Sequence, residues 1–148
     1  MVGRFVGLVS VTTPSATTSY TFDAAGNRVS TTITGVGTST ATFDASNRSV
    51  TSTDPAGRVT TYTYDAIGNQ VSTVTPTGAT TATTFDVMNR PVTITSPEGR
   101  VTTTTYDIAG HSVTRTDGLG AVTQTVYDRA GQVDKTIDPK GKINNPYV

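Results

Sequence analysis

The sequence contains no cysteine, so neither disulfide bridges nor thiolate metal sites can hold the fold together. Leucine occurs only as Leu8 and Leu119, and glutamate, lysine and methionine, which favour helices, are also scarce. No apolar run approaches the roughly 20 residues that a membrane-spanning helix needs. The sequence therefore predicts a chain with little helix and no membrane span.

Charge is also limited, because 11 basic residues balance 11 acidic residues and the formal net charge is zero. The only three lysines, Lys135, Lys140 and Lys142, lie near Asp134 and Asp138, which is typical of a solvated terminus and not of a basic patch. A chain without a basic surface lacks the electrostatic attraction that nucleic acids and anionic membranes require. The charge thus gives no electrostatic indication of either, and we expect no nucleic acid as a partner.

Threonine dominates the composition and valine is the commonest large aliphatic residue, which favours extended chain. Six aromatic–aspartate pairs recur every 21 residues without insertion or deletion, and a fixed period of this kind indicates a repeat architecture. The pairs are Phe22-Asp23, Phe43-Asp44, Tyr64-Asp65, Phe85-Asp86, Tyr106-Asp107 and Tyr127-Asp128. The 148 residues are thus interpreted as about seven copies of one unit, of which the first is incomplete.

Each unit contains a turn directly after its aromatic residue. The fifth position of the unit is always glycine or asparagine, the residues that most readily accept a positive φ. These residues are Gly26, Asn47, Gly68, Asn89, Gly110 and Gly131. Together with the aromatic–aspartate pairs they are the residues predicted to define the repeat. The aspartate is expected to accept hydrogen bonds from backbone amides of the loop.

A second turn follows about ten residues later, where proline is placed for the second position of a β-turn and glycine for the fourth. Its copies are 54–57, 75–78, 96–99 and 138–141, with 117–120 as a variant that lacks proline. Runs of about six residues lie between the turns, a common strand length. The predicted fold is all-β: an antiparallel meander of β-hairpins in a curled strip.

Side chains alternate between the two faces of a sheet, and each 21-residue unit contains two connecting turns. Equivalent residues of successive units therefore share a face only if one of the two turns has an odd number of residues. We place the odd connection at the aromatic–aspartate turn, as a three-residue loop that ends in the left-handed residue with a G1-type bulge. This register predicts a buried valine face and a half-exposed aromatic face. The valines are Val50, Val59, Val71, Val92, Val101, Val113 and Val122, and the aromatics are Tyr62, Tyr64, Phe85 and Tyr106.

The chain is predicted to divide into an incomplete repeat at 1–21, five regular repeats at 22–126 and a divergent repeat or cap at 127–148. Residues 1–11 weakly imitate a signal peptide, but 9–14 parallel 50–55, which favours a repeat fragment. In the last unit Asp134 and Lys135 are expected to protect an exposed sheet edge with charge.

A second periodicity overlies the first. Residues 47–59 resemble 89–101, and 26–31 resemble 68–73, so odd and even units differ. The structural unit is therefore predicted to be a 42-residue pair of hairpins.

The pattern Tyr-Asp-x-x-Gly-Asn, followed by Val, Pro-x-Gly and Thr-x-Tyr-x-Tyr-Asp, resembles the YD repeat of the RHS family, from about residue 3 to 143. The family includes bacterial polymorphic and insecticidal toxins, wall-associated proteins and teneurins. The resemblance implies hairpins that spiral into a hollow shell, which in the toxins encloses a cytotoxic segment, and a secreted or cell-surface bacterial protein. Seven repeats suffice only for a short strip, and the turn at 138–141 only superficially resembles the family's autoproteolytic core region.

Candidate catalytic groups are few. His111 is the only histidine and occupies a turn position where other units have asparagine, arginine or glutamine, so it is interpreted as a turn substitution. With one histidine and no cysteine, neither a catalytic triad nor a usual zinc site can form. Nine of the eleven acids occupy the repeated aspartate positions of the two turns; only Glu98 and Asp134 are out of register with them. The sequence predicts no enzyme and no catalytic, cofactor-binding or metal-binding residue.

Two binding hypotheses compete with structural explanations. Aspartates repeated every 21 residues could bind Ca²⁺ between loops, although no known calcium motif is present. Exposed rings could stack on sugars, but such rings also stabilise a sheet without any ligand; they are Tyr20, Tyr62, Tyr64, Tyr106 and Tyr127. The arginines of the even units are interpreted as solvated charges at strand ends; they are Arg48, Arg58, Arg90 and Arg100.

The sequence thus favours a structural role, as part of a shell or an extracellular scaffold that packs against itself or against neighbouring repeats of a larger parent. Two alternatives stay open. The first is a filament joined by edge-strand pairing, with the strand near 9–13 as the unprotected edge. The second is a glycan-binding adhesion module that uses the aromatic face.

Overall fold

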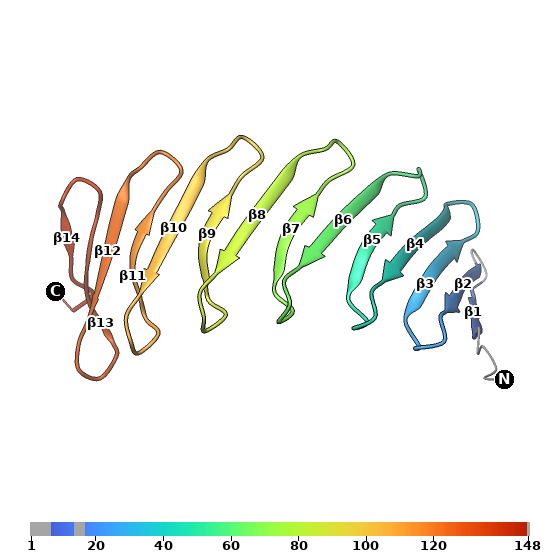
Figure 1. Cartoon of the computed structure of the whole chain (residues 1–148), viewed down its shortest axis with the longest axis horizontal. Helices are drawn as coiled ribbons and strands as arrows, with labels where there is room; N and C mark the ends of the chain where they lie inside the picture. Colours follow the sequence, from blue (N-terminus) through green and yellow to red (C-terminus); the bar gives the residue numbers. More distant parts are fainter. Residues whose placement is uncertain (1–6, 14–16, 148) are drawn as a thin grey trace. The chain divides into compact units, whose positions relative to one another are not determined.

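The computed structural model describes residues 7–13 and 17–147, and in this part of the chain it contains strands and turns but no helix (Figure 1). The strands are β1 (Leu8–Thr12), β2 (Thr17–Phe22), β3 (Arg28–Ile33), β4 (Gly37–Phe43), β5 (Ser49–Thr53), β6 (Val59–Tyr64), β7 (Gln70–Val74), β8 (Thr80–Phe85), β9 (Pro91–Thr95), β10 (Val101–Tyr106), β11 (Ser112–Thr116), β12 (Val122–Tyr127), β13 (Val133–Ile137) and β14 (Ile143–Asn144).

The chain forms two compact units. Unit 1 comprises residues 1–65 and 72–79, and unit 2 comprises 66–71 and 80–148. In unit 1, β1 to β6 each pair antiparallel with the next strand in sequence, and in unit 2 β8 to β14 do the same (Figure 1). The predicted antiparallel hairpin meander is confirmed.

Both kinds of turn are built in the same way. After Phe85, the amide of Asp86 donates to the carbonyl of Arg90 at 3.0 Å, and Asn89 donates to the carbonyl of Asp86 at 3.0 Å. The loop therefore has three residues and ends at Asn89, whose φ is 62°. A left-handed backbone is present at all six fifth positions, as predicted: φ is 88° at Gly26, 60° at Asn47, 102° at Gly68, 93° at Gly110 and 77° at Gly131.

The prediction that only the aromatic–aspartate turn has an odd number of loop residues was partly wrong. The Pro-Gly turn is also a three-residue loop, closed by bonds between Asp54 and Arg58 and by Gly57 with a φ of 79°. The additional residue that sets the parity is a β-bulge beside the aromatic–aspartate turns that follow Phe22, Phe43, Phe85, Tyr106 and Tyr127, for example where the register shifts between Thr105 and Tyr106.

The odd length of the Pro-Gly turn, together with this bulge, overturns the predicted valine face. Thr53 lies opposite Val59, and Ser52 lies opposite Thr60. Alternation along the strands then places Val50 on the same face as Tyr62, with Val59 on the other face. The valines are divided between the two faces and form no single stripe, because one extra residue changes the face of every side chain beyond it.

The two faces differ in composition. In each unit the tyrosine face carries the rings, namely Tyr20, Tyr62 and Tyr64 in unit 1 and Tyr106 and Tyr127 in unit 2. The opposite, threonine face carries hydroxyl pairs across neighbouring strands: Thr21–Ser30 at 2.6 Å, Thr42–Thr51 at 2.6 Å, Thr84–Thr93 at 2.6 Å and Thr105–Thr114 at 2.5 Å. These pairs recur beside the bulge and stabilise the pairing of strands.

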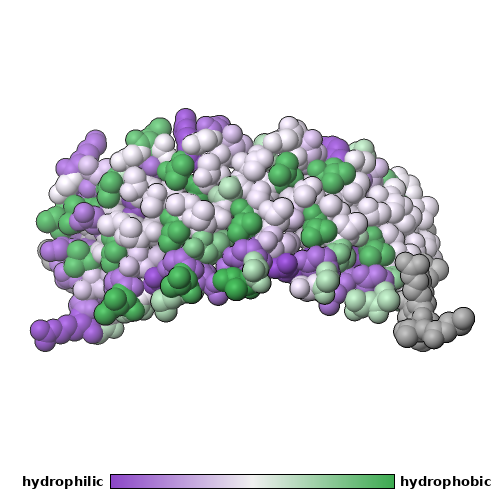
Figure 2. All heavy atoms as spheres, in the orientation of Figure 1, coloured by the Kyte–Doolittle hydropathy of each residue, from purple (hydrophilic) through white to green (hydrophobic). Residues whose placement is uncertain are grey.

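No residue in the described part of the chain is buried, so the expected valine core is absent. Val59 and Val101 are exposed on the threonine face, at 43% and 45%. The aromatic side chains predicted to share a face, Tyr62, Tyr64, Phe85 and Tyr106, are half-buried, as predicted. Figure 2 accordingly shows many residues of intermediate hydropathy on the visible surface. Backbone pairing and contacts between repeats, not a hydrophobic core, therefore carry the fold.

The C-terminal edge also differs from the prediction. Asp134 and Lys135 lie in β13, but the outermost strand is β14, which pairs only with Thr136 and Ile137. Natural sheets use very short edge strands to limit pairing with other chains. The edge is therefore a two-residue strand, with the two charges in the part of β13 that β14 does not cover.

Candidate functional site at the aspartate turns

Each aromatic–aspartate turn is fixed by its own carboxylate. Oδ1 of Asp86 accepts hydrogen bonds from the amides of Met88 and Arg90, at 2.9 and 3.0 Å. The same pair of bonds forms at Asp23, Asp44, Asp107 and Asp128. The aspartates of the Pro-Gly turns accept equivalent bonds at Asp54, Asp117 and Asp138. The expected role of these acids in shaping the turns is confirmed.

These bonds favour the charged form of the carboxylates. Hydrogen bonds from the Arg90 side chain and then its amide lower the pKa of Asp86, and the side chain of His111 lowers the pKa of Asp107 in the same way. Backbone amides of Arg48 and Arg58 are the main cause of the lowered pKa values of Asp44 and Asp54. A carboxylate whose pKa is lowered in this way is a poor proton acceptor at neutral pH.

Arg48 joins its own turn to the next repeat. Its Nε donates to Oδ2 of Asp44 at 2.7 Å, and its Nη1 donates to the carbonyl of Asp65 at 3.1 Å. The guanidinium also lies 4.7 Å from the centre of the Tyr64 ring, within the range of a cation–π contact. The Tyr64 hydroxyl in turn donates to the carbonyl of Ser49 at 2.8 Å. Three contacts thus connect two successive repeats, and the bond to Asp44 anchors Arg48 in its own turn.

Arg90 makes the same connection in unit 2. It bonds to Asp86 at 2.7 Å and to the carbonyl of Asp107 at 3.3 Å, and it lies 4.4 Å from the Tyr106 ring centre. The Tyr106 hydroxyl donates to the carbonyl of Pro91 at 2.8 Å. The interpretation of the even-unit arginines as solvated charges is therefore wrong for Arg48 and Arg90, because a link across repeats leaves no local signal in the sequence.

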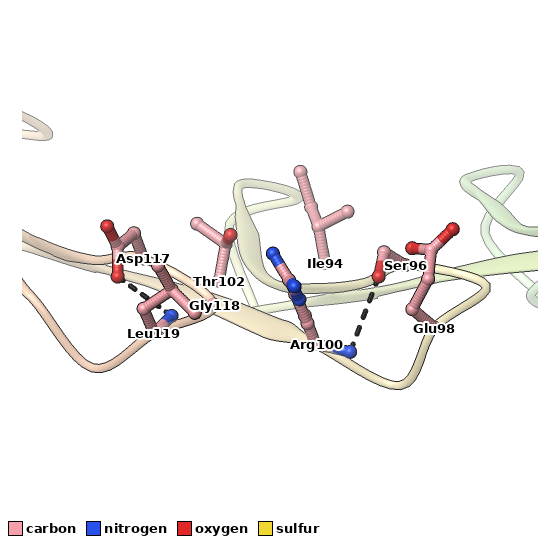
Figure 3. A pocket seen from close by; sticks show the side chains of 8 residues that line it. All are labelled: Ile94, Ser96, Glu98, Arg100, Thr102, Asp117, Gly118 and Leu119. Carbon is pink, nitrogen blue, oxygen red and sulfur yellow. Dashed lines mark hydrogen bonds between the residues drawn. The ribbon is translucent and has the colours of Figure 1, made fainter.

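The other two arginines lie at Pro-Gly turns and make no such link. Arg58 pairs with Asp54 at 2.6 Å, but 70% of its side chain is exposed, as expected of a solvated charge. Arg100 lines a shallow groove of about 410 Å³ in unit 2. The groove residues are Ile94, Ser96, Glu98, Arg100, Thr102, Asp117, Gly118 and Leu119 (Figure 3).

The groove reflects a local departure from the repeat. Gly118 stands where other turns have proline, and a Cβ at Gly118 would lie 2.7 Å from the Cβ of Arg100. Close packing of Arg100 thus explains the glycine. The amide of Arg100 donates to Oγ of Ser96 at 3.3 Å, and that of Leu119 donates to Asp117 (Figure 3). These polar groups are bound within their own turns and do not converge on a ligand.

The turns of the odd units, counted from the unit that begins at Phe22, use a different link to the next turn. Nδ2 of Asn27 donates to Oδ1 of Asn47 at 2.9 Å, and Nδ2 of Asn69 donates to Oδ1 of Asn89 at 3.1 Å. Asparagine thus links odd to even turns, and arginine links even turns to the following repeat. This alternation gives a physical basis to the predicted 42-residue period.

His111 takes part in a third kind of link. Its Nδ1 lies 2.9 Å from Oδ2 of Asp107, and its ring stacks on Tyr127 with centres 4.4 Å apart and planes 18° apart. A Cβ at Gly131 would lie 3.0 Å from Nε2, so the histidine also contacts the next turn. The substitution predicted at this turn is thus a structural contact between repeats.

The tyrosine rings predicted as a sugar-binding row are partly occupied. Arg28, Arg48 and Arg90 lie over Tyr20, Tyr64 and Tyr106, and His111 covers a face of Tyr127. The Tyr127 hydroxyl donates to the carbonyl of Ser112 at 3.2 Å. One face of each of these four rings is therefore unavailable for stacking on a sugar.

A metal site was also a candidate. Within residues 7–13 and 17–147, no group of three or more histidine, cysteine, aspartate or glutamate side chains could hold a metal ion. The repeated carboxylates that could have formed a Ca²⁺ row bind their own loops. In the same described ranges, no helix has the length and hydropathy to span a bilayer.

Comparison with known proteins gives one family and several structures. The family model described as RHS Repeat matches residues 43–81 and 85–122, and curated proteins give no match. Solved structures that resemble the chain include TcdB2-TccC3-TEV, at 15% identity and a TM-score of 0.49, TcdB2-TccC3-Cdc42, at 14% and 0.47, and TcdB2-TccC3, at 14% and 0.46. The alignments cover 85–86% of this chain but only 9–10% of those chains.

Proposed function

Because this chain belongs to the RHS repeat family, we propose that it is a wall segment: a non-enzymatic β-scaffold that forms part of a shell or an extracellular surface structure. The family is a structural repeat and not a catalytic one, which supports a scaffold. Enclosure of a toxin, a secreted or cell-surface location and a bacterial source are parts of the proposal that rest on the family alone.

The observation that carries the proposal is the use of reactive side chains as links between repeats. Arg48 and Arg90 join successive repeats, and His111 does the same through its stacked ring. The turn aspartates are held by their own backbone amides. The side chains that could serve catalysis or binding therefore stabilise the turns and the contacts between repeats.

Within this proposal the chain has three parts. Residues 1–21 are an incomplete repeat, 22–126 are five regular repeats, and 127–148 are a divergent repeat or cap. The repeat-defining aromatic, aspartate and Gly/Asn positions maintain the strip by fixing its turns. The partners are neighbouring repeats of a larger parent or further copies of the chain.

A second candidate function is a filament subunit. Val9 and Val11 lie on β1, are 51% and 53% exposed, and belong to a strand paired with β2. An exposed apolar edge strand is a template for pairing with another chain. No comparable observation favours the glycan-binding alternative.

Negative-stain electron microscopy and light scattering of the purified chain, over a range of concentrations, test both candidates. A wall segment is expected to give discrete small particles at every concentration or irregular aggregates, whereas a filament subunit gives fibres of constant width. Ser10→Pro removes a backbone donor of β1 that points away from β2, and Thr60→Pro serves as a control for general loss of pairing. Fibres that persist in the Ser10→Pro variant would rule out assembly through this edge.

A further inference from the structure

Three aromatic–aspartate turns of unit 2 carry exposed aliphatic side chains at their tips. Val87 is 99% exposed, Met88 65%, Ile108 104% and Ile67 69%. Figure 2 shows hydrophobic atoms along this end of the strands of unit 2. We call Ile67, Val87, Met88 and Ile108 the apolar tips.

The turn itself does not require these residues. Each loop is held by the aspartate at its start and by the left-handed Gly or Asn at its end, so positions between them tolerate most side chains. The equivalent tips elsewhere are small or charged: Ala24-Ala25, Ala45-Ser46 and Arg129-Ala130. A side chain that is 99–104% exposed, as in Val87 and Ile108, gains nothing from packing within the chain. An external partner would explain these apolar residues.

The tips form a row. Successive aromatic–aspartate turns are separated by two strands, which corresponds to roughly 10 Å at the usual spacing of a sheet. The tips of the loops at 86–90 and 107–111 therefore lie next to one another at the same end of the strands (Figure 1). They project from hairpin ends.

The size and chemistry of the row favour a lipid surface over a protein. At about 25 cal/mol per Å², full burial of four such side chains corresponds to roughly 250–500 Å², below the ~800 Å² per partner of a standard protein interface. The tips also lack the tyrosine, tryptophan and arginine anchors that dominate protein interfaces. A bilayer interface accepts aliphatic side chains without demanding a complementary shape.

The charges next to the row are compatible with this partner. Oδ2 of Asp86 is paired with Arg90, and Oδ2 of Asp107 contacts His111, so these carboxylates already have partners. The net charge of the chain is zero, and no lysine lies in these turns. Binding should therefore depend on apolar contact and little on anionic lipid.

We propose that the apolar tips insert into the interfacial region of a lipid bilayer and hold unit 2 at its surface as a peripheral contact. This inference goes beyond the scaffold role and does not involve a membrane span. It assigns to one edge of the strip a function that the repeat itself does not need.

Co-sedimentation of the full chain with phosphatidylcholine vesicles tests the proposal. The triple variant Val87→Ser, Met88→Ser, Ile108→Ser is expected to bind at least about 100-fold more weakly, because each buried aliphatic side chain contributes about tenfold. Leu119→Ser is the matched control, since Leu119 is 78% exposed in the turn 117–120, at the other end of the strands. Its binding should change less than about twofold.

A fluorescence measurement locates the contact. The chain has no tryptophan, so Ile108→Trp introduces a single reporter. Vesicles should shift its emission to the blue and brominated lipid should quench it, whereas Ala45→Trp should respond to neither. Circular dichroism verifies that the variants retain their strands.

Two outcomes overturn the proposal. The first is a failure of the co-sedimentation test: the native chain does not bind the vesicles, or the triple variant binds them as well as the native chain does. The second is that neither protein binds the vesicles and light scattering detects a dimer of the native chain that the triple variant does not form. The row is then a contact between copies of the chain. Neither outcome affects the scaffold proposal, which is tested by electron microscopy.

Discussion

The guanidinium of Arg90 lies over the ring of Tyr106, 4.4 Å from its centre, and the same arginine bonds to the aspartate of its own turn. One side chain thereby holds two successive repeats in register. The hydroxyl of Tyr106 completes the link by bonding back to Pro91. Since no described residue is buried, such links replace the core that stabilises most small domains.

Removal of this link should weaken unit 2 more than removal of a solvated ion pair. Arg90→Met is expected to lower Tm by about 3–6 °C, because cation–π and charged hydrogen bonds are lost together. Arg58→Met loses only the ion pair with Asp54, made by an arginine side chain that is 70% exposed, and should lower Tm by about 0–2 °C. Thermal unfolding followed by circular dichroism measures both. Equal losses would show that the contact with Tyr106 contributes nothing.

His111 should be replaceable by the arginine of the even turns. His111→Arg places a guanidinium beside Asp107 and Tyr127, as Arg90 is placed beside Asp86 and Tyr106, and Tm should stay the same or rise. His111→Ala, which removes both the stacked ring and the hydrogen bond, should lower Tm by about 2–4 °C. A His111→Arg variant as unstable as His111→Ala would show that this turn does not tolerate the arginine link.

Asn89 combines two separable contributions, a left-handed backbone and a hydrogen bond. Asn89→Gly keeps the positive φ but loses the bond from Asn69, so we expect a loss of about 0.5–1 kcal/mol. Asn89→Ala loses both and places a Cβ at a φ of 62°, so its loss should be about 1–2 kcal/mol greater. Urea unfolding measures the difference. A glycine variant as unstable as the alanine variant would contradict the backbone argument.

Acid should destabilise the chain through its turn aspartates. The pKa values of Asp23, Asp44, Asp54, Asp86, Asp107 and Asp117 lie below their ordinary value of 3.8, mainly because amides or neighbouring side chains bond to the charged form. A carboxyl with a lowered folded-state pKa contributes its stability above the unfolded-state value, and this contribution disappears as pH falls through the folded-state value.

Tm is therefore expected to be nearly constant from pH 7 to about 5 and to fall steadily below about pH 4. The double variant Asp44→Asn, Asp86→Asn keeps side chains that can accept from the loop amides but removes two of the titrating groups. Its Tm should fall less steeply with acid than that of the native chain. Parallel curves for the two proteins would show that these carboxylates do not carry the acid dependence.

The sequence by itself determined the repeat, the strands and the shape of the turns. Positive φ at Gly26 and Asn89, and the bonds from loop amides to the turn aspartates, follow from residues within five positions of each other. Local steric and hydrogen-bonding preferences decide such features before any distant contact forms. A fixed period then copies them along the chain.

Only the tertiary structure decided which residues share a face and which repeats are linked. The bulge beside Tyr106 adds one residue and moves valines to opposite faces, a change of parity that no local preference reveals. The contacts of Arg90 with Tyr106 and of His111 with Tyr127 each join residues that are 16 positions apart in sequence. These contacts depend on the register between neighbouring hairpins. Register is a property of paired strands, so it could not be predicted from either strand alone.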